Sequence, residues 1–237
     1  MSTARIQNVS RCPGDRQSLY IVVVTRLFAL LSVLVAACVL AETAVAHKRP
    51  PLRHVTIFGD SVASALDWVP TAKAEVERGN RVTYELHPCG RLATPGCLAN
   101  GQPPSVLDSV KALGRRIGPT VVILVGYNDD PHVYAAGIDR VLHAMHNRGV
   151  KQALWLTLRP VFGGRVSTQY RITNSVIRGA SHRFPWMIVV PWGGYSFPHK
   201  AWFASDGVHF TAAGAVQFAT YVHQTLKSYG LTGPKPG

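Results

Sequence analysis

Three residues that can carry acyl-transfer chemistry come from two distant parts of this 237-residue sequence. Ser61 closes a Gly-Asp-Ser triplet, and a serine hydroxyl becomes a good nucleophile only when a base takes its proton. His209 can be that base, and Asp206, three residues earlier, can hold the other imidazole nitrogen across a tight turn. Taken alone, Ser61 is better explained as a helix N-cap, so the prediction of a Ser-His-Asp site depends on all three residues together.

Two further residues are suited to stabilising a developing negative charge on oxygen. Asn128 follows a strongly apolar run, and its side-chain amide can donate to an oxyanion beside the backbone N–H groups of Ser61 and Gly90. Gly90 has no side chain, so a substrate carbonyl could approach its N–H closely. Both residues also fit ordinary turns, and only their combination with a nucleophile indicates an oxyanion hole.

Short apolar runs typical of buried strands alternate with longer mixed segments typical of helices. The predicted strands are 55–58, 82–86, 121–125, 153–158 and 187–190, and the predicted helices are 61–78, 106–116, 133–147, 168–182 and 211–229. This alternation predicts an α/β fold in which a five-stranded parallel sheet has helices on both faces. Ligands of such sheets bind beyond the carboxyl ends of the strands, where Ser61, Gly90 and Asn128 fall.

Four short blocks, each after a predicted strand, resemble the SGNH (GDSL-type) hydrolase family. They are Gly59–Ser61, Gly90, Gly126–Asp129 and Asp206–His209, and the resemblance covers roughly residues 54–229. It implies a flavodoxin-like three-layer α/β/α sandwich.

The resemblance also implies a role for each candidate residue. Ser61 would be the nucleophile, His209 the base and Asp206 its partner. The oxyanion hole would consist of the Ser61 and Gly90 N–H groups and the Asn128 side chain. The reaction would need neither a metal nor a cofactor.

Two segments are similar to SGNH domains of bacterial envelope enzymes that hydrolyse or transfer acyl groups on surface glycans. They are Cys89–Cys97, with its Cys-Gly-Arg start, and Trp202–Phe210. We therefore expect a serine esterase or acyl-transfer enzyme that acts on acyl esters of envelope glycans or on small acyl esters. Two alternatives stay open, a lipase or lysophospholipase acting on lipid esters and a non-catalytic flavodoxin-like binding module.

The N-terminal region has the parts of a secretory signal. Arg26 precedes an apolar run over 27–41, and small residues follow at Ala44 and Ala46. We expect residues 1–46 to be a signal peptide cleaved after Ala46, which would make the protein secreted or bound to the cell envelope. A retained membrane anchor and lipid attachment at Cys38 are the alternatives.

The rest of the chain divides into a basic, proline-bearing linker at 47–53, one domain at 54–229 and a Gly/Pro-rich flexible tail at 230–237. Export also affects the cysteines, because disulfides persist in oxidising compartments. We expect Cys89 and Cys97 to form one short-loop disulfide, whereas two free thiols would fit a cytoplasmic protein better.

The charge balance indicates an anionic partner. The chain has 25 Lys and Arg against 12 Asp and Glu, a formal net charge of +13, and residues 47–237 alone keep +11. Nucleic acid is disfavoured as the partner because the basic residues are dispersed and the chain has an export signal. The expected contacts are anionic envelope polymers or a membrane surface.

Overall fold

The computed structural model describes residues 52–98, 101–161 and 164–233. The predicted signal or anchor at 1–46 with Cys38, most of the predicted linker and the end of the predicted tail lie outside the described residues. Within the described ranges, no helix combines the length and the apolar character needed to cross a bilayer.

One sheet of five parallel strands forms the centre of the fold, in the order β2-β1-β3-β4-β5. The strands are β1 (Arg53–Gly59), β2 (Asn80–Leu86), β3 (Thr120–Leu124), β4 (Gln152–Leu156) and β5 (Met187–Val190). Each overlaps one of the predicted strands, although β3 and β4 end one and two residues earlier than predicted. β3 is buried along its whole length, as expected for the middle of a parallel sheet. The strand order reverses between β1 and β3, and a ligand site is expected at that switch point.

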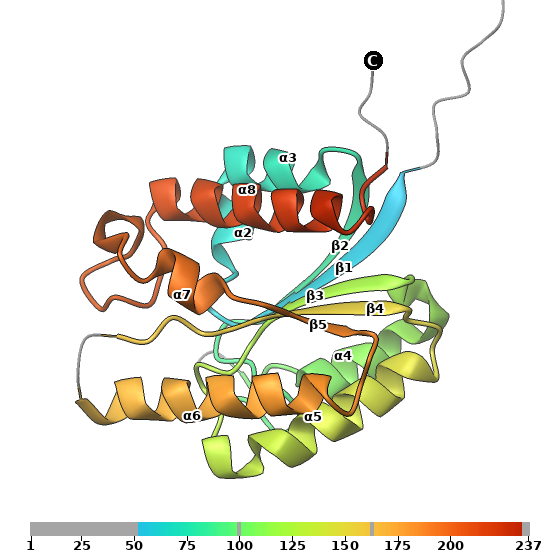
Figure 1. The fold of residues 1–237 in the computed structure, drawn as a ribbon, viewed down its shortest axis with the longest axis horizontal. Helices are drawn as coiled ribbons and strands as arrows, with labels where there is room; N and C mark the ends of the chain where they lie inside the picture. The colour runs from blue at the N-terminus through green and yellow to red at the C-terminus, as the bar shows by residue number, and fades with distance from the viewer. Residues whose placement is uncertain (1–51, 99–100, 162–163, 234–237) are drawn as a thin grey trace, which may run out of the picture. The chain divides into compact units, whose positions relative to one another are not determined.

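Helices cover both faces of the sheet, which confirms the predicted three-layer sandwich (Figure 1). On one face lie α2 (Ala65–Trp68), α3 (Pro70–Glu77) and α8 (Ala212–Ser228), and on the other α4 (Val106–Leu113), α5 (Pro131–His146) and α6 (Gly164–Ser181). Neighbouring strand residues point to opposite cores, so Val122 packs with the first layer and Ile123 with the second. A short helix that the sequence pattern did not reveal, α7 (Trp192–Ser196), follows β5.

The predicted helix over 61–78 is wrong in its extent. Residues 61–64 form turns, α2 begins only at Ala65, and Val69 separates it from α3. Pro70 explains the break, because a proline has no N–H to give to the preceding turn and fits the first position of a new helix. Ser61 therefore caps no helix, and its hydroxyl is left for another partner.

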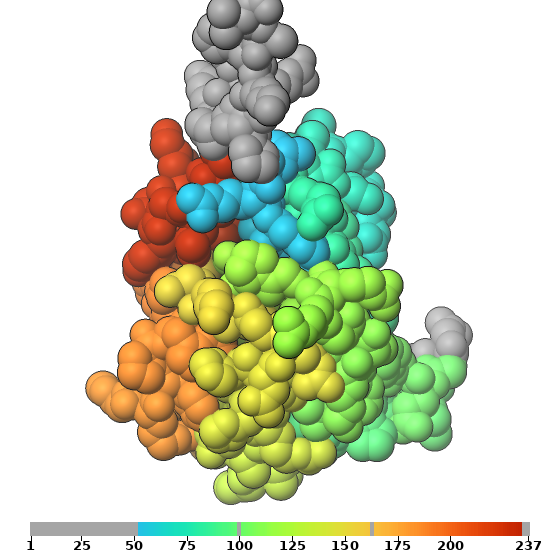
Figure 2. All heavy atoms as spheres, turned by 90° about the vertical axis from the view of Figure 1, so that its right-hand side faces the viewer, coloured from blue at the N-terminus to red at the C-terminus, as the bar shows by residue number. Residues whose placement is uncertain are grey.

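The two ends of the domain meet at the amino ends of the strands. Gly233, in the predicted tail, donates its N–H to the carbonyl of Gly79 at 2.9 Å, just before β2. Figure 2, seen from the right-hand side of Figure 1, shows the start of β1 near the C-terminal part of α8. The carboxyl ends of the strands, with the candidate site residues, lie at the opposite end of the sheet.

Candidate active site

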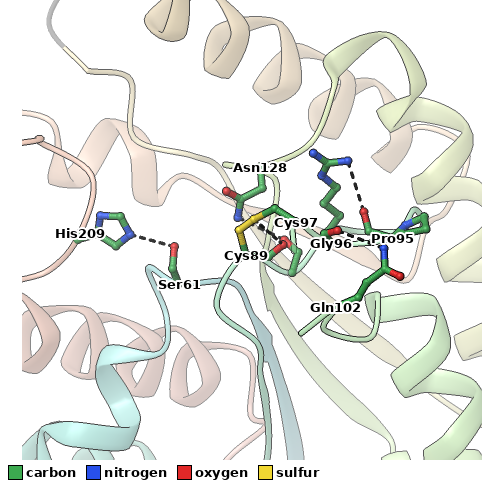
Figure 3. The surroundings of a disulfide bond; sticks show 10 residues. Ser61, Cys89, Pro95, Gly96, Cys97, Gln102, Asn128 and His209 are labelled. Atoms are coloured by element: carbon green, nitrogen blue, oxygen red, sulfur yellow. Dashed lines mark hydrogen bonds between the residues drawn. A yellow bond between two sulfur atoms is a disulfide. The ribbon is translucent and has the colours of Figure 1, made fainter. Parts of the chain in front are cut away.

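Ser61, His209 and Asp206 form one hydrogen-bonded chain, although Ser61 and His209 are 148 residues apart in the sequence. Nε2 of His209 lies 2.9 Å from Oγ of Ser61 (Figure 3). Nδ1 of the same ring lies 2.7 Å from Oδ2 of Asp206. A carboxylate only accepts hydrogen bonds, so Nδ1 carries the proton and Nε2 is left to accept from the serine hydroxyl. The arrangement can pass a proton from Ser61 to His209.

The environment of Asp206 keeps its carboxylate charged. Burial works against the charge, but hydrogen bonds from the His209 ring and from the N–H groups of Val208 and His209 outweigh it and lower the pKa of Asp206. Those N–H groups lie 2.8 and 3.0 Å from Oδ1. The side chains of His209 and Asp206 are each 49% exposed, so a substrate can reach them.

The loop that carries Asp206 and His209 is held by Arg159, a residue just beyond β4 that is only 1% exposed. Its guanidinium donates to the carbonyls of Gly207 at 2.5 Å, Phe197 at 3.1 Å and Ser196 at 3.3 Å. It also lies 4.1 Å from the centre of the Phe203 ring. Gly207 has φ +71°, a conformation that side-chain-bearing residues rarely adopt. Arg159 thus ties the Asp-His turn to the segment after β5.

The turn that carries Ser61 is held by Asp60, whose side chain is completely buried. Its carboxylate accepts the N–H groups of Val62 at 3.1 Å, Tyr127 at 3.2 Å and Gly126 at 3.3 Å. Burial raises the pKa of Asp60 to about 7, although these hydrogen bonds favour the charged form. Asp60 thereby joins the turn after β1 to the turn after β3, across the switch point of the sheet.

The three predicted oxyanion donors differ in their availability. The N–H of Ser61 has no hydrogen-bond partner among the described residues. Asn128 uses one amide hydrogen on the carbonyl of Gly90 at 3.3 Å, which leaves the second one available. The N–H of Gly90, however, donates to the carbonyl of His87 at 2.7 Å, and a Cβ at position 90 would lie 2.7 Å from the same oxygen. That tight turn requires glycine and engages the Gly90 N–H.

The expected disulfide between Cys89 and Cys97 is formed, and it closes the loop that contains Gly90. Figure 3 shows this loop beside Asn128, with Ser61 and His209 across from it.

Asp129 anchors the Cys89–Cys97 loop from the other side, because both of its carboxylate oxygens accept the N–H of Leu92, at 3.1 and 3.2 Å. Burial raises the pKa of Asp129 to about 6.

A second serine also contacts a histidine, but its geometry does not allow a relay. Nε2 of His87 lies 3.1 Å from Glu85 and 3.4 Å from Oγ of Ser109. Both partners share the same ring nitrogen, so the ring cannot pass a proton from one to the other.

Three charged residues that anchor the loops of the candidate site could not be assigned a role from the sequence. Asp60 and Asp129 lie inside motif blocks, and Arg159 follows an apolar run. Each comes within five residues of the end of a buried strand, and a charge at such a place is the signal that could have identified them. Two aromatic residues near the site differ in their surroundings, since Trp192 is buried in the core whereas Tyr127 lines a recess beside Asn128.

No family model matches this chain, and no curated protein matches its sequence. Solved structures do match it. A carbohydrate acetylesterase family member from Sinorhizobium meliloti is 15% identical, with 75% of this chain and 97% of that chain covered and a TM-score of 0.57. The native aryl esterase of M. smegmatis is 12% identical, with 74% and 99% covered and a TM-score of 0.56.

The C-terminal catalytic domain of Streptococcus pneumoniae peptidoglycan O-acetyltransferase A is also similar. It is 18% identical, with 78% of this chain and 98% of that domain covered and a TM-score of 0.53. At identities this low, the structural similarity shows a shared fold and nothing more. The chain therefore has the three-layer α/β/α fold of these structures, which is the fold that the resemblance of its sequence blocks implied.

Proposed function

We propose that this protein is a serine esterase that removes acyl groups from esters or transfers them to another alcohol. The observation that carries the proposal is the hydrogen-bonded chain from Asp206 through His209 to Ser61 at the carboxyl end of the sheet. The two available oxyanion donors, the Ser61 N–H and the Asn128 amide, support it.

In the first step, Nε2 of His209 takes the proton of Ser61 as Oγ attacks the carbonyl carbon of the ester. The carbonyl oxygen becomes an anion, which the Ser61 N–H and the second Asn128 amide hydrogen stabilise. Asp206 stabilises the imidazolium that forms. The ester bond then breaks, and the departing alcohol takes the proton from Nε2, which leaves an acyl group on Ser61.

In the second step, His209 takes a proton from a water molecule or from another alcohol, whose oxygen attacks the acyl-enzyme. Collapse of the second oxyanion releases the acid or the new ester and returns the proton to Ser61. The same residues serve hydrolysis and transfer, and the molecule that reaches the acyl group decides between them.

The names of the similar structures favour acyl esters on glycans as substrates, because they include a carbohydrate acetylesterase and a peptidoglycan O-acetyltransferase. We further propose that the protein acts outside the cytoplasm, at the cell envelope. The signal-like segment at 1–46 and the Cys89–Cys97 disulfide support this location.

Replacing Ser61 with alanine tests the reaction directly. We expect Ser61→Ala to lower the rate of 4-nitrophenyl acetate hydrolysis by at least about a thousandfold, because the variant lacks the hydroxyl that forms the acyl-enzyme. A fluorophosphonate probe should label the wild-type protein at Ser61 and should not label the variant.

The matched control is Ser109→Ala, which removes the other serine hydroxyl that contacts a histidine. It should keep both the activity and the labelling. Undiminished hydrolysis by Ser61→Ala, with a native circular dichroism spectrum, would contradict the proposed mechanism. A wild-type protein that binds esters but never cleaves them would support the non-catalytic alternative, and cleavage of lipid esters alone would support the lipase alternative.

A further inference from the structure

A recess of about 780 Å³ opens beside Asn128, on the side of the oxyanion donors. The loop after β2, the turn after β3, the start of α5 and the N-terminal half of α6 form its walls. The side chains that give it its chemical character are Arg91, Asn128, Arg165, Thr168 and Gln169. Its position next to a candidate oxyanion donor makes it suitable for one side of an ester substrate.

The lining of the recess favours a hydrophilic occupant. A hydrocarbon chain would displace water from guanidinium, amide and hydroxyl groups without replacing the lost hydrogen bonds, which costs free energy. A ligand rich in hydroxyl groups could satisfy the same donors and acceptors. The recess is therefore suited to the alcohol side of a sugar or polyol ester and is unsuited to a long acyl chain.

The two arginines of the recess have donors to spare. Arg165 is exposed on the first turn of α6 and forms no ion pair within the described part of the chain. Arg91 donates from one terminal nitrogen to the carbonyl of Pro95 at 3.3 Å, and its buried Nε has no hydrogen-bond partner among the described residues. The planar fork of a guanidinium is suited to binding two oxygens of one carboxylate or phosphate.

The two acidic residues of the recess are engaged with backbone groups. Asp129 accepts the N–H of Leu92 on both carboxylate oxygens, and burial raises its pKa to about 6. Asp130 caps α5 by accepting the N–H of His132 at 2.9 Å. Both carboxylates therefore have backbone partners. The charge of Arg91 also acts on Asp129 and favours its charged form, but N–H groups of Arg91 and Arg165 remain for a ligand.

We propose that this recess binds the alcohol side of the substrate and that this alcohol is a glycan or polyol with a negatively charged group, paired with Arg165 and Arg91. The assignment of the bound molecule as a substrate rests on the proposed esterase function. The net charge of +11 on residues 47–237 favours the approach of such a polyanion. The anionic group could be the carboxylate of an acidic sugar or the phosphate of a polyol phosphate.

Binding can be measured without turnover in the full-length Ser61→Ala protein. The probes for isothermal titration calorimetry are trigalacturonate, a glycerol phosphate trimer and maltotriose as the neutral reference. We expect at least one anionic probe to bind about tenfold more tightly than maltotriose, with a preference that weakens as salt is added. The probe that binds better distinguishes a carboxylate source from a phosphate source.

Adding Arg165→Gln should weaken binding of the anionic probe by about threefold to tenfold and leave binding of maltotriose nearly unchanged. The matched control is Arg171→Gln, which removes the same charge from an exposed position of α6 outside the recess. It should leave the affinity for both kinds of probe as it was.

Equal affinities for anionic and neutral probes would overturn the proposal, and so would equal losses in Arg165→Gln and Arg171→Gln, which would indicate only a long-range charge effect. Failure of the esterase proposal has a different signature. In that case wild-type protein would not hydrolyse 4-nitrophenyl acetate, although the Arg165-dependent binding of an anionic probe persists. If wild-type protein hydrolyses 4-nitrophenyl acetate but the Ser61→Ala protein binds anionic and neutral probes equally well, only the recess proposal is contradicted.

Discussion

At the scale of single residues, the charge of Asp206 would control the proposed proton transfer from Ser61 to His209. The pKa of Asp206 is lowered, so its carboxylate stays charged at acidities where an ordinary carboxyl group begins to take up a proton. It keeps the Nδ1 proton in place and leaves Nε2 as the acceptor. Once the imidazole gains a second proton, Nε2 can no longer act as a base.

We therefore expect kcat/KM for 4-nitrophenyl acetate to fall on the acid side, because a ring that already holds a second proton cannot take one from Ser61. Asp206 should not add a second step there, since its pKa is held low. The measurement is an initial-rate profile from about pH 4 to pH 9 with protein whose fold is checked at each pH. A flat profile between about pH 5 and pH 8 would argue against a histidine base.

At the scale of secondary-structure elements, the site depends on links between segments that are distant in the sequence. Asp60 connects the turns after β1 and β3, and Arg159 connects the ends of β4 and β5 with the Asp-His turn. The Cys89–Cys97 loop places Gly90 against Asn128. Strands fix the floor of the site, whereas these buried polar links fix the loops that carry its reactive groups.

Arg159→Met should expose the importance of one such link, because it keeps much of the side-chain length but removes every donor. We expect it to lower the free energy of unfolding by at least about 2 kcal/mol, since it leaves buried carbonyls without partners. We also expect kcat to fall about tenfold or more, with a smaller change in KM, because the Asp-His turn loses its anchor at Gly207.

Urea unfolding and steady-state kinetics measure both effects, and Arg159→Lys should recover part of each. The control is Arg183→Met, which breaks an exposed ion pair with Asp139 and should cost under about 1 kcal/mol. If Arg159→Met behaves like this surface variant, the guanidinium does not hold the loop.

Replacing both Cys89 and Cys97 with serine tests the loop that carries Gly90. Loss of a cross-link over a separation of 8 residues should lower the free energy of unfolding by about 2 to 3 kcal/mol. We also expect kcat to fall several-fold, because Gly90 orients Asn128. Reduction of the wild-type protein with dithiothreitol should reproduce both changes, and no change on reduction would show that Asp129 alone suffices to fix the loop.

At the scale of the whole molecule, buried carboxyl groups make the stability depend on pH. The pKa values of Asp60 and Asp129 are raised to about 7 and about 6. Between the pKa of an ordinary Asp, near 4, and these values, the folded protein holds protons that the unfolded chain has released. Each group therefore makes the free energy of unfolding fall as pH rises through that range, by up to about 1.4 kcal/mol per pH unit.

Asp60→Asn isolates one of these contributions, since the amide does not titrate. The pKa values of His54 and His223 are lowered by burial, and these groups act in the opposite direction in both proteins. We expect the free energy of unfolding of wild type minus that of Asp60→Asn to decrease as pH rises from about 4.5 to about 7.5, because only wild type has the titrating carboxyl group. Urea unfolding at each pH measures this difference. A difference that is constant over this range would mean that Asp60 is ionised throughout.

Much of the fold could be predicted because strands are encoded locally. The apolar runs at 121–125 and 187–190 are unambiguous, and the second matches β5 residue for residue. The late start of α2 at Ala65 was harder to place, because residues 61–64 form a turn that Asp60 stabilises through contacts with the distant turn after β3. The short helix α7 was missed because five residues are too few to show a periodic pattern.

By itself, the sequence determined which residue types were available for chemistry, the order of the strands along the chain and the net charge. These follow from local patterns and from counting. The tertiary structure decided which groups meet: Ser61 and His209 are brought to 2.9 Å, Gly90 uses its N–H within a turn, and Arg159 holds Gly207. The reason is physical, because a buried donor or acceptor must find a partner wherever the packed sheet offers one, and that choice depends on the whole fold.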